Sequence, residues 1–266
     1  MTLSSSAFGG SCSDQIDPFD PNDRNLWRKA EYLGRYLFAA DFLGQYQPKI
    51  VADISCGMGY GSVELSKITK AVIAVDGSQE LLEKALMSCK SPTVKFIKKN
   101  LDSEDLVQEI AESSVDAVVS FETIEHLVDP SNAVSQFFRI LRPGGFFLCS
   151  VPNALYESGN SAGLPRNMSH KQWFSFESLK NLVQSHGMQV IYRLGQSRSK
   201  ALFRREQQLF HAKRISEKLS DEPMMHTVGM IRWLSYVVAY PTVEDVDGSY
   251  SIIIVAKKDR AKKHFR

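Results

Sequence analysis

The chain has 266 residues, of which 43% are hydrophobic, and a formal net charge of +2 at pH 7. This length favours one large domain, or one domain with an insertion, and the apolar content suffices for a buried core. The nearly balanced charge argues against nucleic acid as a partner of the whole chain.

The four cysteines are scattered and form no C-x-x-C pair. This spacing predicts no disulfide framework and a reducing compartment, the cytoplasm. Residues 1–23 contain no apolar segment typical of secretory signals, and no apolar run is long enough to span a bilayer. Residues 1–25 are rich in Ser, Gly, Asp and Pro, which predicts a flexible arm.

A helix is predicted over residues 26–44, because apolar residues recur on one of its faces. Residues 50–54 then form an apolar run typical of a buried strand, and Gly57, Gly59 and Gly61 alternate directly after it. Glycines let the backbone approach a ligand closely. The helix predicted to follow would direct its N-terminus at the same ligand.

A second apolar run, residues 71–76, ends in Asp76. A carboxylate at the end of the second strand, after a glycine turn, suits hydrogen bonds to ribose hydroxyls. The remaining predicted elements alternate along the chain: strands at 94–97, 115–121, 146–151, 188–193 and 250–256, and helices at 79–89, 131–141 and 176–186.

This alternation predicts a parallel sheet with right-handed crossovers. Ligands of such sheets bind beyond the carboxyl ends of the strands. Asp53, Asp76, Asn100 and Glu122 each fall at or just after a strand end. The sequence therefore predicts a ligand site at this edge of the sheet.

The glycine spacing differs from the G-x-G-x-x-G of dinucleotide-binding folds. Asp53 followed by alternating glycines resembles motif I of class I S-adenosylmethionine (SAM) methyltransferases, which usually have glycine where this chain has Ser55. The segments F-E-T-I-E-H at 121–126 and L-R-P-G-G at 141–145 resemble those of ubiquinone-pathway and sugar-modifying O-methyltransferases. The resemblance covers residues 28–193 and the last strand.

This resemblance implies an α/β, Rossmann-like class I fold over residues 26–256, with a seven-stranded, mostly parallel sheet and an antiparallel last strand. It also implies SAM as cofactor, with Arg35 on the SAM carboxylate and Asp76 on the ribose. The implied SAM contacts are Arg35, Asp53, Ser55, Cys56, Gly57, Gly59, Asp76, Gly77, Asn100, Leu101, Phe121 and Glu122.

Two of these assignments have a structural alternative. Arg35 is either a SAM ligand or a solvated helix arginine. Asn100 and Leu101 either contact the adenine or belong to a surface turn capped by Asp102.

Residues 195–248 lie outside the resemblance and read as two helices, the first basic and the second, 224–240, apolar. One interpretation is a substrate lid whose basic half faces an anionic group of the acceptor. The other is a pair of helices that packs on the sheet or on a dimer partner. The basic tail, residues 257–266, is expected to be solvated.

Glu122, Glu125 and His126 share one predicted helical turn, and His170 follows a long loop. Carboxylates with neutral imidazoles can ligate Mg²⁺ or Mn²⁺. The set resembles the E-x-x-E-H…H of small-RNA 3′-end 2′-O-methyltransferases, where it binds a metal. In the alternative interpretation His126 is a general base or a packed residue, Glu125 caps the turn and Glu122 contacts SAM through its backbone.

The sequence thus predicts a SAM-dependent O-methyltransferase that acts on a small polyhydroxylated metabolite, with Glu125, His126 and His170 as catalytic residues. Three other functions stay open. They are an RNA 3′-terminal 2′-O-methyltransferase, an N-methyltransferase of an amino sugar or small molecule, and a non-catalytic SAM-binding protein.

Overall fold

The computed structural model describes residues 16–155, 167, 169–196, 208–209, 215–244 and 246–259. Its strands are β1 (Ile50–Ile54), β2 (Ala71–Asp76), β3 (Val94–Lys98), β4 (Val115–Phe121), β5 (Leu141–Pro152), β6 (Met188–Gln196) and β7 (Ser251–Lys258). They form one sheet in the order β3-β2-β1-β4-β5-β7-β6. β1 to β5 pair in parallel, and β7 is antiparallel to β5 and β6. The predicted fold class is confirmed.

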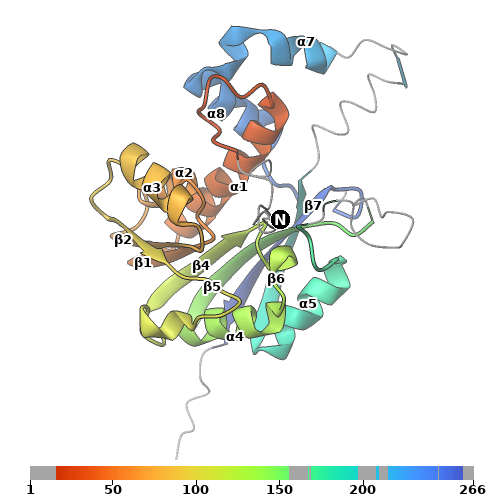
Figure 1. The fold of residues 1–266 in the computed structure, drawn as a ribbon. Coiled ribbons are helices and arrows are strands. Elements are labelled where there is room, and N and C mark those ends of the chain that lie inside the picture. Colours follow the sequence, from red (N-terminus) through yellow and green to blue (C-terminus); the bar gives the residue numbers. More distant parts are fainter. Residues whose placement is uncertain are drawn as a thin grey trace, which may run out of the picture.

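Helices cover both faces of this sheet (Figure 1). One face carries α1 (Leu26–Gly44), α2 (Tyr60–Leu65) and α3 (Gln79–Ser88), and the other carries α4 (Pro130–Ile140) and α5 (Phe176–Ser185). The remaining helices among the described residues are α7 (Ile215–Asp221), α8 (Val228–Val237) and three 3₁₀ turns, η2 (Leu106–Gln108), η3 (Ile124–His126) and η4 (Pro223–His226).

Local sequence explains where several helices begin. The side chains of Ser78, Asp129 and Ser175 each accept a hydrogen bond from a backbone N–H in the first turn of α3, α4 and α5. The strand predicted over 146–151 begins earlier in the structure. Residues 141–145 also belong to β5, where Leu141 pairs with Val115 ahead of a register shift.

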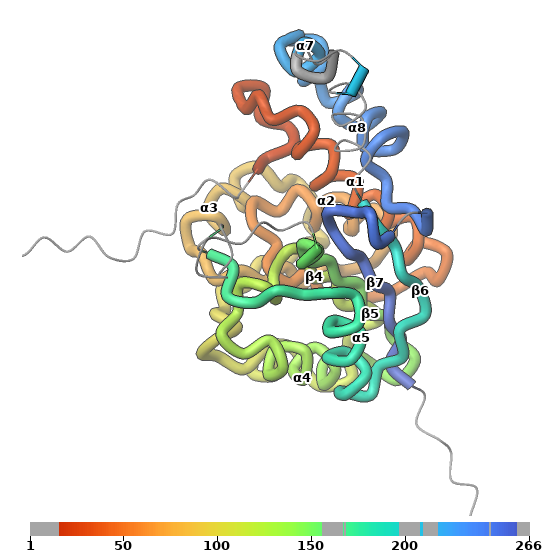
Figure 2. Tube along the Cα trace, turned by 90° about the vertical axis from the view of Figure 1, so that its right-hand side faces the viewer, coloured from red at the N-terminus to blue at the C-terminus, as the bar shows by residue number. Residues whose placement is uncertain are grey.

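The apolar half of the insertion packs on α1 and not on the sheet. Ile231 and Leu234 of α8 share a buried cluster with Leu33 and Leu37 of α1. The helices approach closely at Gly34, where a Cβ would lie 2.5 Å from the carbonyl oxygen of Ala239. Figures 1 and 2 both show α8 beside α1, on the side away from α4 and α5.

Lys29 joins the N-terminal segment to this helical layer. It is fully buried, and its Nζ donates to the carbonyl oxygen of Asp20 and lies 3.3 Å from Nδ1 of His226. Nε2 of His226 lies 2.8 Å from the carbonyl oxygen of Ser220, so it carries the proton and Nδ1 accepts from Lys29. Burial lowers the pKa of Lys29. Ile16 is also buried. Residues 16–20 are therefore at least partly packed, and the flexible arm predicted over 1–25 is wrong for them, whereas most of residues 21–25 are exposed.

Three predictions fall on parts of the chain outside the described residues. These parts are residues 1–15 of the arm, most of the basic half of the insertion, and the tail from residue 260 onward. Across the described residues, no helix combines the length and the apolar character needed to cross a membrane.

Candidate active site

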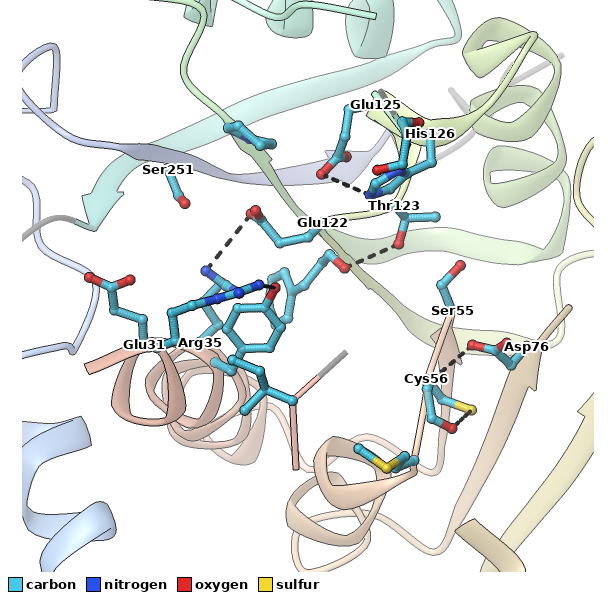
Figure 3. A pocket seen from close by; sticks show the side chains of 18 of the residues that line it. Glu31, Arg35, Ser55, Cys56, Asp76, Glu122, Thr123, Glu125, His126 and Ser251 are labelled. Carbon is cyan, nitrogen blue, oxygen red and sulfur yellow. Dashed lines mark hydrogen bonds and ion pairs between the residues drawn. The ribbon is translucent and has the colours of Figure 1, made fainter. Parts of the chain in front are cut away.

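A cavity of about 830 Å³ opens where β1, β2 and β4 end, at the edge of the sheet that the sequence predicts. The loop after β1 and Asp76 at the end of β2 form one side, and residues 121–127 other than Ile124 form another. α1 supplies a third wall, which includes Glu31 and Arg35 (Figure 3).

The loop after β1 turns its backbone toward the cavity. Ser55, Gly57 and Gly59 adopt positive φ angles of 62°, 54° and 77°. A Cβ at Gly57 would meet no atom within 4 Å, so the backbone there faces open space that a ligand can fill. Ser55 takes the left-handed conformation that glycine adopts more easily, which explains why glycine is usual at this position of the motif.

Asp76 is held rigidly at the cavity wall. Its Oδ2 accepts a hydrogen bond from the Gly57 amide at 2.9 Å, and its Oδ1 accepts one from the Ser78 amide at 2.8 Å. Burial raises the pKa of Asp76, and these two amides oppose the rise. This placement suits an acceptor for ribose hydroxyls.

Asp53 lies beneath the cavity and does not line it. It is fully buried, Oδ1 accepts from the Tyr36 hydroxyl at 2.9 Å, and Oδ2 accepts from the Ser62 hydroxyl. Burial raises its pKa to about 6. The predicted direct contact of Asp53 with SAM is therefore wrong, since both carboxylate oxygens bind α1 and α2 instead.

The loop after β3 also stays away from the cavity. Asn100 is exposed and accepts from the Asp102 amide at 3.0 Å, whereas Leu101 is buried in the core. Asp102 accepts from the Val128 amide at 2.8 Å. The structure matches the surface-turn alternative and not the predicted adenine contacts. Gly59 and Gly77 do not line the cavity either.

Arg35 faces the cavity although it is almost fully buried. Its Nη1 donates to Oε1 of Gln196 at 2.9 Å and lies 3.8 Å from Oε1 of Glu122, and its guanidinium lies 4.6 Å over the Tyr32 ring. The solvated-arginine alternative is wrong.

Glu122 adopts a positive φ of 49°, and its Oε1 accepts from the Ser150 hydroxyl at 2.8 Å. Figure 3 shows its carboxylate directed at Arg35. Glu122 is therefore not part of the predicted metal-ligand set, because Arg35 and Ser150 engage its carboxylate.

Glu125, His126 and His170 do converge. One ligand atom of each lies within 4.8 Å of the others. Nδ1 of His126 lies 3.1 Å from the carbonyl oxygen of Ser169, which only accepts, so Nδ1 carries the proton and Nε2 is the basic nitrogen. Nε2 lies 3.8 Å from Oε1 of the buried Glu125. Nε2 of His170 lies 2.9 Å from Nδ2 of Asn167.

Sequence reasoning missed most of the wall that α1 supplies. Arg28, Glu31, Tyr32 and Arg35 line the cavity, and their helical spacing could have been recognised as one face. Other lining residues carried no local signal: Ile16, Trp27, Met58, Tyr60, Thr123, Tyr250 and Ser251. None of the described residues of the insertion, Gln196 included, lines the cavity. The predicted lid is therefore wrong for them.

The open α/β sheet, the glycine turn and the strand-end carboxylate define a Rossmann-like enzyme that binds a nucleoside-containing cofactor. Residues 25–193 match the model of the methyltransferase domain family, and the chain belongs to that family. It is a SAM-dependent methyltransferase.

Three known proteins illustrate the likeness. A Mycolicibacterium smegmatis protein named "Probable S-adenosylmethionine-dependent methyltransferase" is 28% identical over 77% of this chain and 80% of its own length. A ubiquinone biosynthesis O-methyltransferase of Alkalilimnicola ehrlichii is 28% identical over 45% of this chain and 48% of its own. The structure of 1,6-didemethyltoxoflavin-N1-methyltransferase from Burkholderia thailandensis, with bound S-adenosylhomocysteine, shares the fold. Its TM-score is 0.52 at 15% identity, over 89% of this chain and 80% of that one.

Proposed function

We propose that this methyltransferase transfers a methyl group from SAM to a hydroxyl of a small polyhydroxylated metabolite, such as a sugar or glycoside. One observation carries the proposal. A histidine pair with a buried carboxylate lies on the same cavity as the glycine loop and Asp76. Such a group can take the proton of a hydroxyl, which is a poor nucleophile while protonated.

The residues at the cavity fit SAM. The ribose would lie against Asp76, and the open backbone at Gly57 leaves room for the ligand. The carboxylate and ammonium of the methionine part would face Arg35 and Glu122, whose opposite charges lie 3.8 Å apart. SAM supplies the methyl group, and the protein positions the reactants, excludes water and supplies a base.

His126 is the base in this proposal. As the acceptor oxygen forms its bond to the methyl carbon, the carbon–sulfur bond breaks and Nε2 takes the hydroxyl proton. The Ser169 carbonyl fixes the tautomer with Nε2 unprotonated, and the carboxylate of Glu125 at 3.8 Å stabilises the imidazolium that results.

The same three residues, Glu125, His126 and His170, also support a second form of this proposal, in which Mg²⁺ or Mn²⁺ assists the reaction. The ligand atoms of Glu125, His126 and His170 lie within 4.8 Å of one another. One metal ion between them could reach all three, because each bond to the metal is about 2.0–2.6 Å long. The carbonyl on Nδ1 of His126 is the outer contact typical of metal-ligating histidines. His170 would have to exchange its contact with Asn167 if it ligated through Nε2.

The test is a panel of acceptors incubated with labelled SAM, with products identified by mass spectrometry. The panel pairs sugars with their amino-sugar analogues, free sugars with their phosphates, and includes RNA 3′ ends. We expect O-methylated sugars, with the phosphates preferred if the acceptor is anionic. Methyl transfer to amines or RNA alone would overturn the proposal, and SAM binding without turnover would favour a binding protein. Loss of activity in excess chelator, restored by Mg²⁺ or Mn²⁺, would select the metal variant.

A further inference from the structure

Gln196 occupies an unusual position for a residue at the start of an insertion. It is the last residue of β6 and only 2% exposed. Its Nε2 donates to the carbonyl oxygens of Glu31, at 2.9 Å, and Ala239. Because these two acceptors can only face the amide nitrogen, Oε1 must face the other way, where it accepts from Nη1 of Arg35 at 2.9 Å.

The guanidinium of Arg35 is thereby held from three directions. Gln196 binds Nη1, the carboxylate of Glu122 lies 3.8 Å from the same atom, and the ring of Tyr32 lies 4.6 Å from the guanidinium carbon. Glu122 is itself fixed by the Ser150 hydroxyl at 2.8 Å. A buried arginine held in this way cannot adopt alternative rotamers without leaving polar groups unsatisfied.

We propose that Gln196 is a positioning residue for the cofactor, which orients Arg35 toward the carboxylate of SAM. This inference rests on the Arg35–carboxylate contact of the proposed function. It gives the insertion a role at the site that differs from a lid. The insertion leaves the sheet at Gln196, and Ala239 lies near its end. The side-chain amide of Gln196, which binds Arg35, also donates to the carbonyl oxygen of Ala239.

The test compares two ligands in calorimetry without any acceptor. S-adenosylhomocysteine carries the carboxylate, whereas 5′-methylthioadenosine has the same nucleoside and sulfur but no amino-acid part. Gln196→Met removes both ends of the amide at nearly constant volume. We expect it to weaken S-adenosylhomocysteine binding about tenfold, as for a lost hydrogen bond to a charged group, and to change 5′-methylthioadenosine binding less than about twofold.

Gln136→Met is the matched control. Gln136 is equally buried, and its Oε1 accepts from the Leu106 amide at 2.8 Å, away from the cavity. Gln136→Met should alter the stability of the protein, but it should not change the affinity for one ligand relative to the other. Arg35→Met should weaken the binding of S-adenosylhomocysteine at least as much as Gln196→Met does. The double variant should bind it little more weakly than Arg35→Met alone.

Two outcomes overturn the inference. Equal weakening of both ligands by Gln196→Met would show a merely structural role, and no weakening of either would show no role at all. Both readouts are independent of the acceptor, so a failure to methylate hydroxyls would leave this result unaffected.

Discussion

The imidazole rings of His126 and His170 meet edge to face, with centroids 4.8 Å apart. One ring follows β4 and the other lies between β5 and α5 in the chain, so the fold brings together two bases from separate segments. The structure places these two rings together, as the sequence-based expectation of convergence requires. Together with Glu125 they form the group from which we expect the proton chemistry of this enzyme.

Replacing His126 by alanine should abolish methyl transfer and spare cofactor binding. Loss of a general base typically costs 10²–10⁴-fold in rate. Initial rates and S-adenosylhomocysteine calorimetry measure the two effects separately. His186→Ala is the control, because His186 contacts Ser131 and lies outside the cavity lining. Comparable rates for the two variants would remove His126 from the reaction.

Asp76→Ala should weaken SAM binding by about 1–3 kcal/mol, as expected for loss of a charge-assisted hydrogen bond to ribose. Part of this loss reflects the Gly57 and Ser78 amides, which lose their acceptor. Calorimetry gives the affinity. Asp102→Ala, which also removes an acceptor of a backbone amide but lies outside the cavity lining, should bind SAM normally. Unchanged affinity in Asp76→Ala would contradict this cofactor pose.

Asp53→Asn should reveal a pH-dependent stability term. The pKa of Asp53 is raised from 3.8 to about 6, so the folded state binds its proton more tightly than the unfolded state. The contribution of this bound proton to the free energy of unfolding is therefore present below about pH 4 and is lost as the pH rises through 6. The asparagine variant cannot titrate there.

The difference in unfolding free energy between Asp53→Asn and the parent should consequently shift by about 2–3 kcal/mol in favour of the variant between pH 4 and pH 7. Denaturant titrations at several pH values measure it. A difference that is constant with pH would show that Asp53 has an ordinary pKa.

Gly61→Ala should destabilise the fold by about 1–3 kcal/mol, the usual cost of overpacking a core. A Cβ at Gly61 would lie 2.2 Å from the Tyr36 ring, which is buried and binds Asp53. Gly229→Ala is the matched control, since a Cβ there meets no atom within 4 Å and alanine favours the helix by up to about 1 kcal/mol. Thermal melts should move in opposite directions for the two variants.

The fold could be predicted from the sequence because each element carried its own signal. The period of apolar residues located α1, and the caps that the structure shows at Ser78 and Ser175 lie next to the helices that they begin. Asp76 and the glycine turn located the cofactor edge for the same reason, since their positions relative to strand ends are local facts.

Other site features depend on contacts between distant segments. Nothing in the sequence shows that Tyr36 and Ser62 occupy the oxygens of Asp53, or that Arg35 draws Glu122 away from the histidines. The wall formed by α1 was hidden for a further reason. Its face toward the cavity is polar, and only its apolar face signals burial.

The buried amine of Lys29 has a practical consequence for the design of shortened forms of this protein. The family match begins at residue 25, which would be the natural place to truncate. A chain cut there would lose the carbonyl of Asp20 that Lys29 binds, and Ile16, which lines the cavity. It would leave a buried cation short of an acceptor. A shortened form of the protein should therefore start before residue 16. Reaction of Lys29 with an amine-reactive label would show that the packing around its buried amine has been lost.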